Sequence, residues 1–180
     1  MSELAKLGLI VGGLLIVGYG SLVAAPGTVR KWLRMFPRSK AMAWMLAAVD
    51  LVWAGKLLYA APLGRFDTLK PMIYVLAPVA VILVGFFVDE LLAPRALGGL
   101  FLLLAAPMLD IARWHASPLR LVITVLAYGM VIEGMILVVC PYQFRKWLER
   151  LLGSDRHCRV CGGFGCALGI LILVLSLTVY

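Results

Sequence analysis

The residues whose types and spacing come nearest to a reactive site lie close to the C-terminus. His157 is followed by Cys158, Cys161 and Cys166, and a Cys-x-x-Cys pair is the usual half of a zinc or iron–sulfur site. The second half-site is missing, and Cys166 falls within an apolar stretch. We interpret these cysteines and Cys140 as small, buried or interfacial side chains, with a metal or redox site as the alternative, and we predict no cofactor.

Other reactive constellations are missing from the sequence. His115 and His157 do not suit one haem, because they fall in loops on opposite faces of a membrane whose hydrocarbon core is about 30 Å thick. The chain also has no nucleotide-binding loop, nucleophile elbow or His-Glu-x-x-His motif. We therefore predict that the protein is not an enzyme.

Three charged residues interrupt apolar stretches: Asp50, Lys56 and Glu133. Charges inside a membrane are costly, so they usually face protein or water and often mark function. We predict that both carboxylates point into the helix bundle and find polar partners, with Lys56 as the candidate partner of Asp50. The alternative is a protonated or hydrogen-bonded carboxyl group that only fixes helix packing.

The composition is that of a membrane protein. Of its 180 residues, 63% are hydrophobic and 14% charged, and the mean hydropathy is +1.02. Stretches of about 18 to 20 almost uncharged residues can cross a hydrocarbon core. We predict one all-α integral membrane domain over residues 1–180 with about six spans, near 7–25, 41–61, 72–88, 96–111, 121–140 and 160–180.

Two segments of the chain resemble one another at a distance of 115 residues. Arg30-Lys31-Trp32-Leu33 recurs as Arg145-Lys146-Trp147-Leu148, and Pro26 corresponds to Pro141. We predict two copies of one helical hairpin facing the same way, over residues 7–61 and 121–180. A middle hairpin, 72–112, lies between them.

Glycines are expected at the helix contacts. The 115-residue offset aligns Glu133 with Gly18 and Asp50 with Gly165. Each carboxylate then has a glycine near its depth on the partner helix, and glycine leaves room for a side chain or a water there. Gly8-x-x-x-Gly12 likewise predicts close packing of the first span.

The repeated basic segments predict where the chain meets the membrane surface. Apolar residues recur in them at helical spacing, so we expect short amphipathic turns in the headgroup plane that contact anionic lipid. The predicted interface anchors are Arg30, Lys31, Trp32, Arg145, Lys146 and Trp147. The net charge of +8 follows from such clusters beside spans, so we predict no nucleic-acid partner.

The same charge bias predicts the orientation of the chain. Basic connections stay in the cytoplasm, so both repeated basic segments are expected there. An even number of spans then leaves both termini outside the cytoplasm. The expected location is the inner (plasma) membrane, crossed several times.

The C-terminal hairpin resembles a known family. Glu133-Gly134, Pro141, Arg145-Lys146 and Arg159-x-x-Gly162-Gly163 resemble the YjeT-like family of small bacterial inner-membrane proteins, a domain of unknown function. The N-terminal copy matches more loosely, with Gly18 in place of the acid and no glycine pair. The resemblance implies a two-span hairpin in a bacterial inner membrane and implies no activity.

Two functions from different classes fit these features. The first is a non-enzymatic integral membrane subunit that scaffolds or stabilises a larger membrane complex, with other subunits or further copies as partners. The alternative is a small proton- or ion-coupled transporter or channel that uses Asp50 and Glu133. Parallel copies count against the alternative, because many secondary transporters are built from inverted repeats.

Overall fold

The chain is an assembly of long and short helices. A computed structural model describes residues 2–62, 70–72, 76, 78–79, 82–83 and 92–180, and within these ranges it contains helices and turns but no strand. The helices are α1 (Glu3–Ala24), α2 (Pro26–Met35), α3 (Lys40–Ala60), α5 (Leu92–Arg113), α6 (Leu121–Val139), α7 (Pro141–Leu152) and α8 (Asp155–Thr178). Two 3₁₀ turns, η1 (Phe36–Arg38) and η3 (Pro118–Arg120), precede α3 and α6.

Five of the described helices are long and apolar enough to cross a membrane. They are Glu3–Ala24, Lys40–Ala60, Leu92–Arg113, Pro118–Val139 (which includes η3) and Asp155–Thr178. The all-helical class expected from the sequence is therefore confirmed for the described residues, and these five helices have the length and composition of membrane spans. The predicted third span, 72–88, lies largely outside the described residues, so the number six remains a prediction.

Local sequence signals set the helix ends. The hydroxyls of Ser2, Ser39 and Ser154 accept hydrogen bonds from the backbone N–H groups of the first turns of α1, α3 and α8. Such N-caps satisfy donors that have no partner inside the helix. Pro26 and Pro141 open α2 and α7, where the missing N–H of proline costs nothing.

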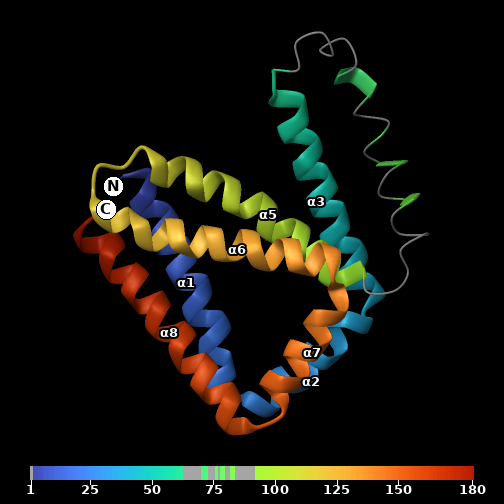
Figure 1. Cartoon of the computed structure of the whole chain (residues 1–180), viewed down its shortest axis with the longest axis vertical. Helices are drawn as coiled ribbons and strands as arrows, with labels where there is room; N and C mark the ends of the chain where they lie inside the picture. The colour runs from blue at the N-terminus through green and yellow to red at the C-terminus, as the bar shows by residue number, and fades with distance from the viewer. Residues whose placement is uncertain (1, 63–69, 73–75, 77, 80–81, 84–91) are drawn as a thin grey trace.

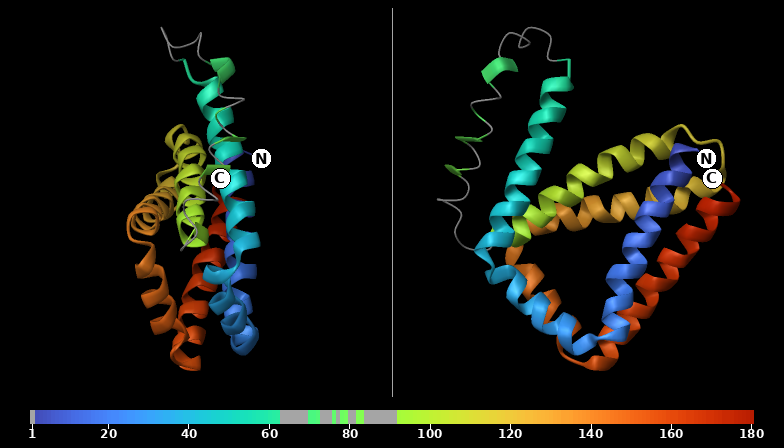
Figure 2. Two further views of the ribbon diagram at one scale, coloured as in Figure 1. Left: turned by 90° about the vertical axis from the view of Figure 1, so that its right-hand side faces the viewer. Right: turned by 180° about the vertical axis from the view of Figure 1, so that it is seen from behind.

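The long helices form an open, flat triangle (Figures 1 and 2). The pair α1–α8 makes one side and the pair α5–α6 makes a second, and the two pairs meet near both chain termini. The short helices α2 and α7 lie on the third side, and α3 extends along α5. The molecule is therefore thin when it is seen edge-on (Figure 2).

The two spans of each predicted hairpin barely touch one another. α1 packs along α8 rather than α3, while α6 packs along α5 rather than α8. The reason is the length of the connecting helices, because the ten residues of α2 and twelve of α7 extend about 15 and 18 Å at 1.5 Å per residue. The spans therefore pair across the chain, and the duplication of the hairpins stays a prediction.

Glycines let the paired helices approach closely. A Cβ atom added to Gly12 would lie 3.0 Å from the carbonyl oxygen of Gly169, and one added to Gly8 would overlap the hydroxyl of Ser176. The prediction that Gly8 and Gly12 form a packing face is thus confirmed. Gly98 and Gly134 make the equivalent contact between α5 and α6.

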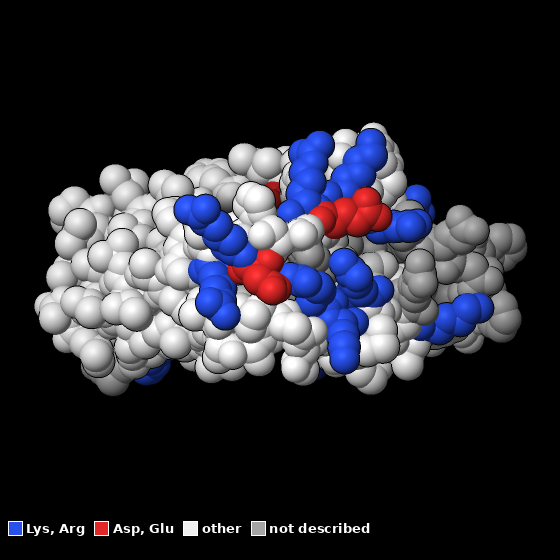
Figure 3. All heavy atoms as spheres, turned by 90° about the horizontal axis from the view of Figure 1, so that it is seen from below, with Lys and Arg blue, Asp and Glu red and all other residues white. Residues whose placement is uncertain are grey.

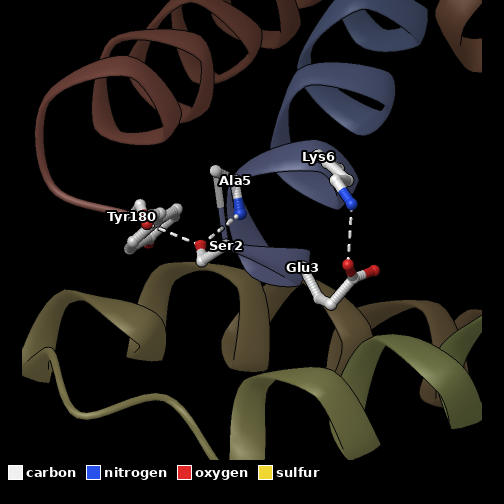
Figure 4. A network of polar contacts seen from close by, with 5 residues as sticks. All are labelled: Ser2, Glu3, Ala5, Lys6 and Tyr180. Atoms are coloured by element: carbon white, nitrogen blue, oxygen red, sulfur yellow. Dashed lines mark hydrogen bonds and ion pairs between the residues drawn. The ribbon is translucent and has the colours of Figure 1, made fainter.

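The core lies where the two pairs of helices meet, beside the chain ends. It consists of Leu4, Ala105, Met108, Ala112, Ile123 and Ala127. Ser2 donates a hydrogen bond of 2.5 Å to the carbonyl oxygen of Tyr180, and Lys6 pairs with Glu3 at 2.8 Å (Figure 4). The Tyr180 hydroxyl donates to the carbonyl oxygen of Leu119 at 2.6 Å, which ties α8 to the α5–α6 connection.

Replacing Tyr180 with phenylalanine is expected to destabilise the place beside the chain ends where the two helix pairs meet. The variant keeps the ring but loses the bond to Leu119, at a cost of about 0.5–1.5 kcal/mol. Burial raises the pKa of Tyr180 above its ordinary value near 10, so the hydroxyl stays protonated at neutral pH. The contribution of this hydrogen bond to stability is therefore lost only as the pH rises through the raised pKa of the folded protein. The measurement is the unfolding midpoint of the purified protein at pH 7.

The matched control is Tyr128→Phe. Tyr128 is exposed on α6 and makes no hydrogen bond within the described part of the chain. Its replacement should leave the midpoint unchanged. Equal midpoints for the two variants would show that the Tyr180 hydroxyl stabilises nothing.

Candidate functional site

Asp50 is half-buried at the contact between two membrane-spanning helices. It lies at the middle of α3, on the face that includes the buried residues Ala43 and Ala47, because positions separated by three or four residues share one side of a helix. This face packs on α5. A Cβ atom added to Gly99 of α5 would lie 2.8 Å from Oδ2 of Asp50, so the carboxylate occupies the space that this glycine leaves.

One oxygen of this carboxylate lacks a partner. Oδ1 of Asp50 is buried and makes no hydrogen bond to any described residue. Lys56, its predicted partner, is exposed and forms no ion pair with it among the described residues. The predicted pair is wrong because six residues along a helix turn a side chain about 120° away.

The glycine opposite Asp50 differs from the predicted one. The repeat offset aligned Asp50 with Gly165 and placed Gly18 near its depth on the predicted partner helix. A Cβ atom on Gly18 would meet nothing within 4 Å, and Gly165 lies against the ring of Tyr19 on α1. The glycine that accommodates Asp50 is Gly99 of α5. The idea that a glycine makes room for this carboxylate is therefore right, and the glycine predicted for it is wrong.

Glu133 lies on the surface of the chain. α6 buries Ile123, Ala127, Gly134 and Leu137. Glu133 precedes Gly134, and one residue turns a side chain about 100° around a helix. Its side chain is consequently exposed, and the prediction that it is buried inside the single chain is wrong.

The side of α6 that carries Glu133 is also distinct from its outermost face. The outermost face is a regular series of exposed residues: Leu121, Val125, Tyr128, Ile132, Met135 and Val139. Glu133 is not in this series, and Gly129 and Ile136, about one turn away from it, are half-buried. The negative charge of the carboxylate acts on the phenol of Tyr19 on α1 without a hydrogen bond between the two side chains. Sequence reasoning missed Tyr19, which has no signal beyond being a tyrosine within a span.

The glycine predicted near Glu133 does not accommodate it. The predicted partner helix, 160–180, has Gly165 near the depth of Glu133, but Gly165 lies against the ring of Tyr19. A Cβ atom on Gly129, four residues before Glu133, would have nothing within 4 Å. Glu133 thus lies beside a patch of helix surface that another helix could approach closely.

The cysteine cluster lies inside a helix. The first turns of α8 contain His157, Cys158 and Cys161, whereas the predicted span began only near residue 160 and left His157 in a loop. Cys158 is fully buried, Cys161 and His157 are exposed, and Cys166 is half-buried. Among the described residues, no group of three or more Cys, His, Asp and Glu side chains comes close enough together to hold a metal ion.

The predicted interface anchors lie on α2 and α7, as two short amphipathic helices rather than loops. Lys31, Trp32, Arg145, Lys146 and Trp147 are exposed, and Arg30 is partly covered by its ion pair with Asp155. Seen from the side of the triangle formed by α2 and α7, the molecule shows many lysines and arginines gathered together (Figure 3). The predicted amphipathic segments are therefore confirmed as helices.

Comparison with known proteins places the last third of the chain near one family. Residues 122–176 match a family model described as "uncharacterized protein conserved in bacteria (DUF2065)". The matched segment comprises most of α6, all of α7 and most of α8. It agrees with the predicted resemblance to a bacterial family of unknown function. No curated protein and no solved structure matches the chain.

Proposed function

We propose that the protein is a non-enzymatic membrane subunit that scaffolds or stabilises a larger membrane protein complex. The observation that carries this proposal is the position of Glu133. Its carboxylate is exposed on a membrane-spanning helix, and it makes no hydrogen bond or ion pair within the described ranges. A charge at the centre of a spanning helix costs about 2.5–3.5 kcal/mol on insertion scales, so a partner helix with a polar group would stabilise it.

The surroundings of Glu133 support a protein partner. Gly129 lies on the same side of α6 about one turn away, and a Cβ atom there would have nothing within 4 Å. A small residue at such a position lets a neighbouring helix approach closely in lipid. A polar group beside an uncovered glycine suits a helix–helix contact better than contact with lipid tails.

The proposal predicts that Glu133→Leu leaves the chain folded but disrupts its assembly. Leucine removes the carboxylate from this surface, and the exposed position of the side chain leaves the packed contacts of α6 in place. Glu133→Gln keeps two hydrogen-bonding groups and should assemble normally. The measurement is the size of the complex on native gels of mildly solubilised membranes, together with the unfolding midpoint of the isolated chain.

The control is Ile132→Ala, which removes an exposed apolar residue of the outermost face one position away. It should change neither the complex nor the midpoint. A complex of normal size for Glu133→Leu would refute the proposed contact. If Glu133→Leu abolished the complex and also lowered the unfolding midpoint of the isolated chain, Glu133 would instead stabilise the fold of the chain itself.

The alternative function is a small proton- or ion-coupled transporter or channel. The observation that favours it is the buried Oδ1 of Asp50, because an unpartnered carboxylate oxygen within a span can accept a proton or a cation. Asp50→Asn and Glu133→Gln separate the two functions. Under the transport function both variants assemble but lose the flux that the parent shows in reconstituted vesicles. Under the scaffold function both variants assemble, and neither the parent nor the variants show flux.

We also infer that the chain is an expanded, duplicated relative of the YjeT-like family, with six spans and both termini outside the cytoplasm of a bacterial inner membrane. The two connections support the duplication. Ala25 precedes Pro26 with φ −137° and ψ 62°, and Cys140 precedes Pro141 with φ −126° and ψ 64°. In both places a long helix passes directly into a short amphipathic one.

A further inference from the structure

The helices α2 and α7 form one antiparallel seam, although they are far apart in sequence. Arg30, near the start of α2, forms an ion pair with Asp155, just beyond the end of α7. Phe36, just beyond the end of α2, packs on Phe144, near the start of α7, with 6.0 Å between ring centroids. The end of each helix therefore lies beside the beginning of the other.

Most charges along this seam are positive and exposed. The exposed cations of α2, α7 and the first turns of α8 are Lys31, Arg34, Arg145, Lys146, Arg150, Arg156 and Arg159. Two acids accompany them, and one of these, Asp155, is already paired with Arg30. The other is Glu149. The seam therefore keeps a positive excess, which Figure 3 shows as lysines and arginines gathered on this face.

Apolar side chains accompany these cations. Trp32 and Trp147 are 56% and 40% exposed, one on each helix. Exposed tryptophans are enriched at the boundary between headgroups and acyl chains. A surface that combines exposed cations with exposed tryptophans, beside membrane-spanning helices, fits a membrane lipid better than a soluble acidic partner.

We propose that the α2–α7 seam is a binding site for the phosphate groups of anionic membrane lipids, built jointly by the two helices. The lipid phosphate pairs with lysines and arginines of both helices, while the tryptophans contact the start of the acyl chains. A bound lipid bridges the α1–α8 pair and the α5–α6 pair, because α2 follows α1 and α7 follows α6. Anionic lipid thereby stabilises the arrangement of the spans.

The test measures the stability of the purified full chain with added lipid. Phosphatidylglycerol should raise the unfolding midpoint in detergent, and phosphatidylcholine should not. Lys31→Gln combined with Lys146→Gln removes one cation from each helix. Its apparent affinity for phosphatidylglycerol should be about 10- to 30-fold lower, since each cation near an anionic surface contributes to binding.

The control is the double variant Lys56→Gln with Arg113→Gln. It removes the same charge from exposed residues of α3 and α5 that lie outside the seam. It should bind phosphatidylglycerol as the parent does. Equal stabilisation of the parent by the two lipids would overturn the proposal. Equal weakening by the two double variants would also overturn it, because net charge rather than the seam would then govern binding.

Discussion

Replacing Gly98 with alanine is expected to destabilise the α5–α6 pair strongly. The added Cβ would lie 2.7 Å from the carbonyl oxygen of Gly134 and 2.8 Å from Cβ of Leu137. Neither atom is the flexible end of a side chain, so the two helices must move apart. Overpacking of this kind costs about 1–3 kcal/mol, and Gly98→Leu should exceed that range. Thermal or denaturant unfolding of the purified chain measures the loss.

Gly129→Ala provides the matched control. Gly129 lies on the neighbouring helix α6, and a Cβ there would have nothing within 4 Å. Both substitutions gain helix propensity of up to about 1 kcal/mol, so their difference isolates the packing term. Gly134→Ala should resemble Gly98→Ala, because its Cβ would lie 2.8 Å from the carbonyl oxygen of Gly98. A midpoint for Gly98→Ala equal to that for Gly129→Ala would show that the two helices do not cross at these glycines.

The spans and their connections could be predicted from the sequence because they depend on local composition. Hydropathy located the five described spans, and prolines marked the starts of α2 and α7. The start of α8 at Asp155 was missed by several residues. A signal for it existed, because Ser154 followed by an acid is a typical N-terminal capping pattern.

The pairing of the spans could not be predicted in the same way. Apolar helix surfaces are alike in lipid, so hydropathy does not tell which helix packs on which. The glycines that decide the pairing were visible, but their partners were not: Gly12 meets Gly169, and Gly98 meets Gly134. For the same reason the sequence indicated that Asp50 needs a glycine beside it but did not identify Gly99 as that glycine.

Replacing Gly99 with alanine is expected to displace the Asp50 carboxylate and to weaken the α3–α5 contact. The new Cβ would lie 2.8 Å from Oδ2 and 3.4 Å from Cγ of Asp50. No other described side chain or neighbouring backbone lies within 4 Å of it. The whole penalty, about 1–3 kcal/mol, therefore depends on Asp50 being present. In an Asp50→Ala background the same substitution should be neutral or slightly stabilising, because alanine favours the helix.

A double-mutant cycle on unfolding free energies measures this dependence. Gly99→Ala and Asp50→Ala, singly and together, should give a coupling of about 0.5–3 kcal/mol, the range found for residues in contact. Glu133→Ala serves as the control for Asp50→Ala, since it also removes a carboxylate from a spanning helix, but no atom of Glu133 lies within 4 Å of a Cβ atom on Gly99. It should not relieve the Gly99→Ala penalty. Additive effects of Gly99→Ala and Asp50→Ala would mean that the carboxylate does not occupy the space beside Gly99, whereas strong coupling would fix Asp50 at the α3–α5 contact in the folded protein.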